Sequence, residues 1–126
     1  MKFRAICENH LYVKAYNRGK RFVGKAIAVY VLPDFRAEKI RRAHPEKKKI
    51  NRLGLTTSKK LGTAVVRSRT RRILREAYRT VTREHQMKQG FLIVLSAREA
   101  ATKMKSSELV PELARAFERL QMFIPS

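Results

Sequence analysis

The chain of 126 residues carries 30 lysines and arginines against 10 aspartates and glutamates, a net charge of +20 at pH 7 that indicates a polyanionic partner. Its hydrophobic fraction of 44% predicts a single domain, residues 1–126, with one modest core, and excludes a wholly disordered basic tail. No apolar run approaches membrane-spanning length and residues 1–10 lack the apolar region of a signal peptide, so we expect a cytoplasmic protein without a membrane partner.

The first predicted element is a short helix within "ENHLYVKAYNRGKR", residues 8–21. Tyr12 and Tyr16 lie four residues apart and therefore share one face of this helix. Asn9 is a candidate cap at its start. Gly19 is expected to end the helix in a left-handed backbone conformation.

A long, mostly buried strand is predicted in "RFVGKAIAVYVLP", which is rich in β-branched and aromatic residues and stops at Pro33. Side-chain alternation places Ile27, Val29 and Val31 on one face of this strand and Tyr30 on the other. Residues 34–50 hold seven basic residues and three acids without a sustained period, which predicts a charged, partly flexible loop.

Two further buried strands are predicted in "RLGLTTS" and, after Gly90, in "FLIVLSAR". The final helix is expected to begin after Ser106 or Ser107 and to carry an apolar stripe. That stripe consists of Leu109, Leu113, Phe117 and Leu120.

Between these two strands, residues 67–83 hold seven arginines and one acid, Glu76. On a helix, at about 100° per residue, most arginines fall on one side and the apolar residues on the other. Val65 is the exception, because it falls among the arginines. The apolar side consists of Val66, Ile73, Leu74, Ala77, Tyr78 and Val81. We therefore expect one face to pack on the sheet and the other to present a row of guanidinium groups.

The start of this helix is suited to phosphate, because free backbone N–H groups and the helix dipole add to the charges of Lys59 and Lys60. A merely solvated charged face is the plainer interpretation, but such faces usually mix signs and here only Glu76 is placed to pair with an arginine. A helix lying on a membrane surface is disfavoured because the flanking strands need the apolar face. The segment therefore favours nucleic-acid binding.

The segment "SKKLGTAVVRSRTRRILREAYR" resembles the signature of the protein subunit of bacterial ribonuclease P, in which Ser-Lys-Lys-x-Gly-x-Ala-Val leads into an Arg-Asn-Arg helix, a basic pair and Arg-Glu. The resemblance extends through "YVKAYNRGKRF", "AVYVLP", "RLGLTTSKK" and "GFLIVLSAREAA" to nearly the whole chain apart from residues 34–50. The departure is Ser68, where the family usually has asparagine. A hydroxyl is shorter than a carboxamide and cannot make the same two-ended hydrogen bonds.

The resemblance implies an α+β fold: a single α/β sandwich in αβββαβα order with a four-stranded sheet, in the class of the second domain of ribosomal protein S5. It also implies a left-handed crossover through the arginine helix. The general rule for parallel strands predicts a right-handed one.

The resemblance implies a subunit that binds a large catalytic RNA, in a holoenzyme that removes the 5′ leader of precursor tRNA by hydrolysing one phosphodiester. The magnesium-dependent chemistry of the family resides in the RNA, so magnesium is expected to be held mainly by RNA and substrate and the protein alone to be inactive. One protein per RNA is expected, and the oligomeric state of the free protein stays open. The implied contacts with the catalytic RNA are Lys59, Lys60, Arg67, Ser68, Arg69, Arg71, Arg72 and Arg75.

A cleft between the first helix and the sheet is implied for the single-stranded leader. Stacking on unpaired bases is a common use of aromatic side chains near basic residues, although core packing is the commoner role of aromatics at helical spacing. The implied leader contacts are Tyr12, Tyr16, Arg18, Lys20, Arg21 and Tyr30.

Side-chain chemistry also predicts a binding subunit, with no catalytic and no metal-binding residue. Metal-dependent phosphodiester hydrolysis needs clustered carboxylates, and the only aspartate is Asp34, in the charged segment. The histidines are scattered without ligand spacing, and the glutamates of the last helix are expected to be solvated. These residues are His10, His44, His85, Glu108, Glu112 and Glu118.

Two rival functions stay open from the sequence: a small basic ribosomal RNA-binding protein, and a self-sufficient nuclease or DNA-binding module. The scarcity of clustered acids opposes a nuclease, and the lack of a short two-helix unit opposes helix-turn-helix binding of DNA. The RNA that co-purifies with the protein would distinguish a ribosomal protein.

Overall fold

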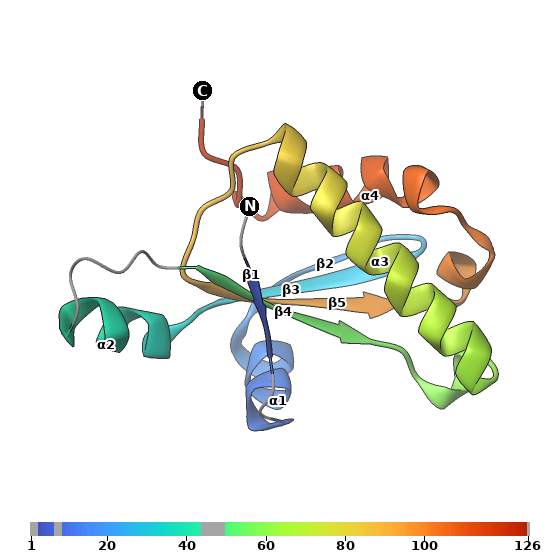
Figure 1. Cartoon of the computed structure of the whole chain (residues 1–126), viewed down its shortest axis with the longest axis horizontal. Coiled ribbons are helices and arrows are strands. Elements are labelled where there is room, and N and C mark those ends of the chain that lie inside the picture. The colour runs from blue at the N-terminus through green and yellow to red at the C-terminus, as the bar shows by residue number, and fades with distance from the viewer. Residues whose placement is uncertain (1–2, 7–8, 44–49, 126) are drawn as a thin grey trace.

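The structure is a computed structural model that describes residues 3–6, 9–43 and 50–125 (Figure 1). It contains five strands, four α-helices and two short 3-10 helices, η1 and η2, among the described residues. In chain order they are β1 (Phe3–Ala5), α1 (Asn9–Arg18), β2 (Lys20–Val23), β3 (Ile27–Pro33), α2 (Phe35–Ala43), β4 (Asn51–Thr56), η1 (Lys59–Leu61), α3 (Ala64–Glu84), β5 (Phe91–Ala97), η2 (Glu99–Lys103) and α4 (Ser106–Arg119).

The described strands form one five-stranded sheet in the order β1-β4-β5-β3-β2. β1, β4 and β5 run parallel, whereas β3 is antiparallel to both β5 and β2. Helix α1 covers one face of the sheet, and α3 and α4 cover the other (Figure 1). The predicted αβββαβα sandwich is confirmed, and the structure adds a short edge strand, β1, and helix α2 to it.

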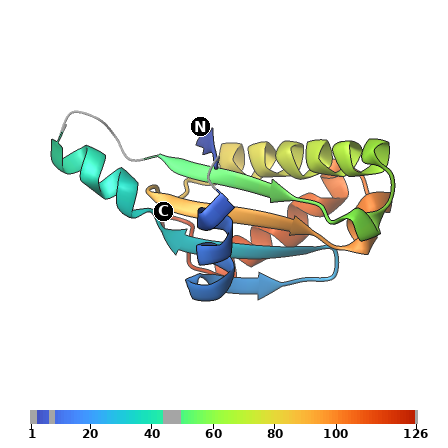
Figure 2. The same ribbon diagram turned by 90° about the horizontal axis from the view of Figure 1, so that it is seen from below.

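The crossover from β4 through α3 to β5 joins neighbouring parallel strands. Figure 2 shows the sheet from the side that α1 covers, with α3 behind it. In this view β4 and β5 both point to the right, and β5 lies below β4. This path is left-handed, as the family resemblance implied and against the general rule.

The main core lies between the sheet and helices α3 and α4. Ile27, Val29 and Val31 of β3 point into it, as their alternation predicted. The largest buried side chain is Tyr78 of α3, whose ring meets that of Phe117 edge-on with centroids 6.0 Å apart. Burial raises the pKa of the Tyr78 phenol to about 12, although a hydrogen bond with the Asn51 side chain acts in the opposite direction.

The prediction of a loop is wrong for residues 35–43, which form helix α2. Residues 44–49 lie outside the described part. Asp34 explains the helix: its carboxylate accepts a hydrogen bond from the backbone N–H of Arg36 at 3.1 Å and so satisfies a free donor of the first turn. No helical period is visible in the sequence here, because α2 extends away from the sheet (Figure 1) and each of its side chains with a described exposure is exposed to solvent.

Gly19 follows α1, but the prediction of a left-handed backbone there is wrong: among described glycines only Gly62 and Gly90 have positive φ. Close packing explains the residue instead. A Cβ at Gly19 would lie 2.5 Å from the carbonyl oxygen of Ala15 and 2.9 Å from that of Val31. Glycine therefore lets the chain turn tightly from α1 into β2.

Glu112 of α4 is not the solvated side chain that the sequence predicted. Its half-buried carboxylate accepts hydrogen bonds from the backbone N–H groups of Lys25, Ala26 and Ile27 at 3.2, 2.9 and 2.8 Å. Lys25 and Ala26 lie in the turn between β2 and β3, and Ile27 begins β3. One carboxylate thus fastens the β2–β3 hairpin to the last helix.

Replacing Glu112 with glutamine is expected to lower the free energy of unfolding by about 1.5–3 kcal/mol, because hydrogen bonds to a charged acceptor contribute about that much. Urea denaturation would measure the change. Glu118→Gln, at an exposed position of the same helix, is the matched control and should be near neutral. Equal stability of the two variants would contradict the fastening role.

Candidate nucleic-acid interface

The arginine segment folds as α3, and its two faces are those that the sequence predicted. Thr63 caps the helix by accepting a hydrogen bond from the Val66 N–H at 3.3 Å. Five of the six predicted apolar positions are buried and Val66 is half-buried, whereas Val65, on the arginine side, is 78% exposed. The arginine face therefore points away from the core along the length of the helix.

Two arginines of this face are anchored to the protein. The Arg71 guanidinium donates to Thr57 Oγ1 at 2.7 Å and to Ser68 Oγ at 3.2 Å. Arg69 donates to the backbone carbonyl of Thr102 at 2.9 Å. Ser68, at the position where the family usually has asparagine, therefore accepts from Arg71 and helps to orient it.

Other arginines keep donors available. Arg79 pairs with Glu76 at 2.9 Å on the exposed surface, as the spacing predicted. Within the described part of the chain, Arg72 and Arg75 have no side-chain hydrogen bond or ion pair. The Nε atom of Arg67 is buried without a hydrogen-bond partner, an arrangement that is unfavourable unless a ligand supplies the acceptor.

Lys59 and Lys60 lie on η1, one short turn before α3, and both are exposed. Gly62 separates them from the helix with φ of 140°, a conformation that glycine adopts without strain. The two ammonium groups therefore lie near the positive end of the α3 dipole, as the sequence predicted for phosphate binding.

The predicted leader tyrosines lie on the opposite face of the sheet, beside α1. The rings of Tyr16 and Tyr30 meet edge-on with centroids 4.7 Å apart, and the Tyr16 hydroxyl donates to Thr56 Oγ1 at 3.2 Å. Tyr12 lies against Gly54, where a Cβ would come within 2.5 Å of the ring. All three rings pack on a small core and keep part of their surface exposed, so core packing leaves each ring accessible to solvent.

The cations predicted beside the tyrosines are divided between two faces. Arg21 is paired with Tyr30 across β2 and β3 and therefore shares its face, whereas Lys20 is paired with Val31 and points toward the α4 side. Lys20 and Arg18 line a separate hollow of about 270 Å³, together with Leu120 and Met122 of the C-terminal segment. The structure thus brings Arg21 to the tyrosines, but not Arg18 or Lys20.

The tyrosine surface includes residues that sequence reasoning missed. Ser96 lies opposite Ala28 and beside Thr56, and Val23 at the end of β2 is 58% exposed. Side chains alternate between the two faces of a sheet along each strand. Once the strand pairing is known, this alternation places Ser96 and Val23 on the same face as Tyr30 and Gly54. We define the tyrosine surface as Tyr12, Tyr16, Arg21, Val23, Tyr30, Thr56 and Ser96.

Among the described residues, no group of three or more histidine, cysteine, aspartate or glutamate side chains is placed to hold a metal ion. The donor set there does not fit a magnesium site of the protein's own. His44 lies outside the described residues. None of the helices formed by the described residues has both the length and the apolarity needed to cross a membrane.

Comparison with known proteins identifies a family for this chain. The family model for ribonuclease P matches residues 1–121. The ribonuclease P protein component of Clostridium acetobutylicum is 30% identical over 124 residues, covering 98% of this chain and 94% of that protein. The chain belongs to the ribonuclease P protein family.

Solved structures of ribonuclease P proteins share the fold. The protein from Staphylococcus aureus superposes with a TM-score of 0.74 at 23% identity, covering 98% of this chain and all of that one (100%). The protein from Thermotoga maritima gives a TM-score of 0.68 at 18% identity, covering 98% and 99% of the two chains.

Membership of this family decides between the functions that the sequence left open. The chain is the protein subunit of ribonuclease P, the RNA-based endoribonuclease that matures the 5′ end of tRNA, and not a ribosomal protein. The family does not by itself say which residues touch which RNA.

Proposed function

We propose that this subunit binds the catalytic RNA through the arginine face of α3 and the single-stranded 5′ leader of precursor tRNA through the tyrosine surface. The catalytic-RNA contacts are Lys59, Lys60, Arg67, Ser68, Arg69, Arg71, Arg72 and Arg75. Ser68 acts mainly by orienting Arg71, and Arg18 and Lys20 are left out of the leader contacts because they line another hollow.

One observation supports this proposal above the others: the two surfaces meet at adjacent residues. Thr57 accepts a hydrogen bond from Arg71 of the arginine face, and Thr56 accepts one from Tyr16 of the tyrosine surface. An RNA strand held by the tyrosines therefore leaves the sheet beside the start of α3. This proximity suits a leader that must stay close to the catalytic RNA.

In this proposal the protein contributes binding and charge, and the RNA contributes the chemistry. Magnesium is held by RNA and substrate, and no step of the reaction is assigned to a protein side chain. The cations of α3 and η1 reduce the repulsion between two polyanions, while the tyrosines fix the leader. One domain, residues 1–126, carries both surfaces, with one protein per RNA, in the cytoplasm where precursor tRNA is processed.

The test compares precursor and mature tRNA binding to the reconstituted holoenzyme. Tyr16→Ala is expected to weaken precursor binding about 5- to 150-fold, because stacking contributes about 1–3 kcal/mol per base, and to leave mature tRNA unchanged. Arg21→Gln should lower the log–log salt slope for the precursor by about 0.7, and Lys20→Gln should not. Lys20 is the matched control because it is the neighbouring exposed cation on the other face.

Equal losses for precursor and mature tRNA would overturn the leader proposal, as would equal effects of the two cation variants. Because Tyr16 also packs on the small core, thermal unfolding of each variant must accompany the binding measurement. Arg21 is exposed, so its variant stays informative if Tyr16→Ala is unstable.

A further inference from the structure

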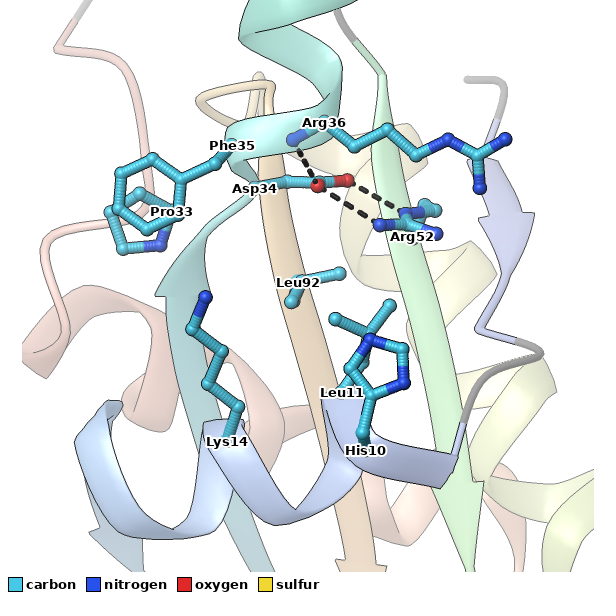
Figure 3. Close-up of a pocket in the computed structure, with 9 residues that line it drawn as sticks. All are labelled: His10, Leu11, Lys14, Pro33, Asp34, Phe35, Arg36, Arg52 and Leu92. Atoms are coloured by element: carbon cyan, nitrogen blue, oxygen red, sulfur yellow. Dashed lines mark hydrogen bonds and ion pairs between the residues drawn. The ribbon is translucent and has the colours of Figure 1, made fainter.

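A second hollow lies on the α1 face of the sheet, on the other side of α1 from the tyrosines. Along β4, Tyr12 and Tyr16 contact Gly54 and Thr56, whereas this hollow begins at Arg52. Figure 3 shows the hollow with α1 below it, the strand ends behind it and the start of α2 above it. Its volume is about 280 Å³. It is near the lower end of the size of small-ligand pockets, roughly 300–1,000 Å³, and so suits one nucleotide-sized group.

The back of this hollow is built around a buried ion pair. Arg52 Nε donates to Asp34 Oδ2 at 2.7 Å, and a terminal nitrogen of Arg52 donates to Asp34 Oδ1 at 2.9 Å. The side chains are only 11% and 4% exposed. The same carboxylate caps α2 through Arg36 N–H, so the pair fixes α2 against the sheet and neutralises the only acid that lines the hollow.

The remaining lining combines the apolar side chains of Leu11, Pro33 and Leu92 with basic and aromatic side chains. His10 and Lys14 project from α1 toward α2, and Arg36 lies above Arg52 (Figure 3). Phe35 is 61% exposed, and Lys14 Nζ lies 5.0 Å from its ring centroid. An exposed aromatic ring among cations, with no uncompensated acid in the lining, matches the base and the phosphate of an unpaired nucleotide.

We infer that this hollow binds a nucleotide of the 5′ leader that lies farther from the tRNA than those at the tyrosine surface. The base stacks on Phe35, and Lys14 and Arg36 contact the phosphate. The positions of the two sites along β4 determine the order in which the leader reaches them. The tyrosines adjoin the start of α3 at Thr56, whereas the hollow lies at the opposite end of β4. The exposed Lys39 and Arg42 of α2 extend the positive surface beyond it. This inference rests on the proposed leader-binding function.

The experiment measures binding of precursor tRNAs with a nested series of leader lengths to the reconstituted holoenzyme. Phe35→Leu removes the aromatic face but keeps apolar bulk, Lys14→Gln removes the charge, and Arg119→Gln, at an exposed position of α4, is the charge control. For long leaders, Phe35→Leu should weaken binding about fivefold, the low end expected for one stacked base. Lys14→Gln should lower the salt slope by about 0.7. Neither variant should affect the shortest leaders, and Arg119→Gln should affect none.

If Tyr16→Ala weakens binding of precursors at every leader length while the Phe35 and Lys14 variants match Arg119→Gln, the inference fails and the proposed function stands. If all of these variants bind as the wild type does, both fail. Equal losses for short leaders, long leaders and mature tRNA would assign the hollow to another part of the RNA and would also overturn the inference. Phe35 is largely exposed, so its variant is expected to fold normally.

Discussion

Replacing Arg67, Arg72 and Arg75 together with glutamine is expected to lower the affinity for the catalytic RNA by roughly a thousandfold or more. Each charged hydrogen bond contributes about 1.5–3 kcal/mol, and about 1.4 kcal/mol corresponds to a factor of ten. These arginines are chosen because Arg72 and Arg75 have no side-chain partner in the described part of the protein and Arg67 keeps a buried unpaired donor. The log–log salt slope should fall by roughly 2 to 3, at about 0.7–0.9 per contact.

A matched triple variant separates specific contacts from general charge. Arg79→Gln, Arg83→Gln and Arg119→Gln remove the same net charge from exposed positions that the proposal does not use. Filter binding over a range of salt concentrations would compare the two triples, with thermal unfolding as a check because Arg67 and Arg75 are half-buried. Equal losses of affinity would show that the RNA responds only to the total charge.

Replacing Asp34 with alanine is expected to lower the free energy of unfolding by about 3–5 kcal/mol, because it removes the carboxylate that pairs with the buried Arg52 guanidinium. The loss is large against the total stability of a small domain, about 5–15 kcal/mol. The start of α2 should loosen as well, since Arg36 N–H loses its acceptor. Chemical denaturation measures the first effect, and hydrogen exchange at Arg36 measures the second.

The double variant Asp34→Ala with Arg52→Met is the control for this prediction. Removing both charges should recover part of the lost stability, because a buried pair often contributes little net free energy although a single buried charge is costly. Two results would contradict this account of the pair. One is an Asp34→Ala variant as stable as the wild type. The other is a double variant whose loss of unfolding free energy exceeds the summed losses of the two single variants.

Local periodicity was sufficient to determine the two faces of α3 and the inward face of β3 from the sequence alone. A helix with a 3.6-residue repeat and a strand with a two-residue repeat each sort their own side chains, so no distant partner is needed to predict Ile73 or Val29 as buried. The net charge and the row of arginines likewise determined the class of partner. The left-handed crossover came from the family resemblance, because periodicity carries no handedness.

Tertiary structure decided where isolated side chains meet partners far along the chain. Strand register sends Arg21 to the tyrosines and Lys20 to the other face, and a shift of one residue would reverse them. The helix at 35–43 depends on Asp34 being held by Arg52, and Glu112 finds its partners about 85 residues away. Such contacts depend on how the helices and strands pack against one another. The residue pattern within a single helix or strand does not contain that information. The sequence therefore identified the arginine face, whereas only the packed sheet defined the tyrosine surface and the hollow beneath α2.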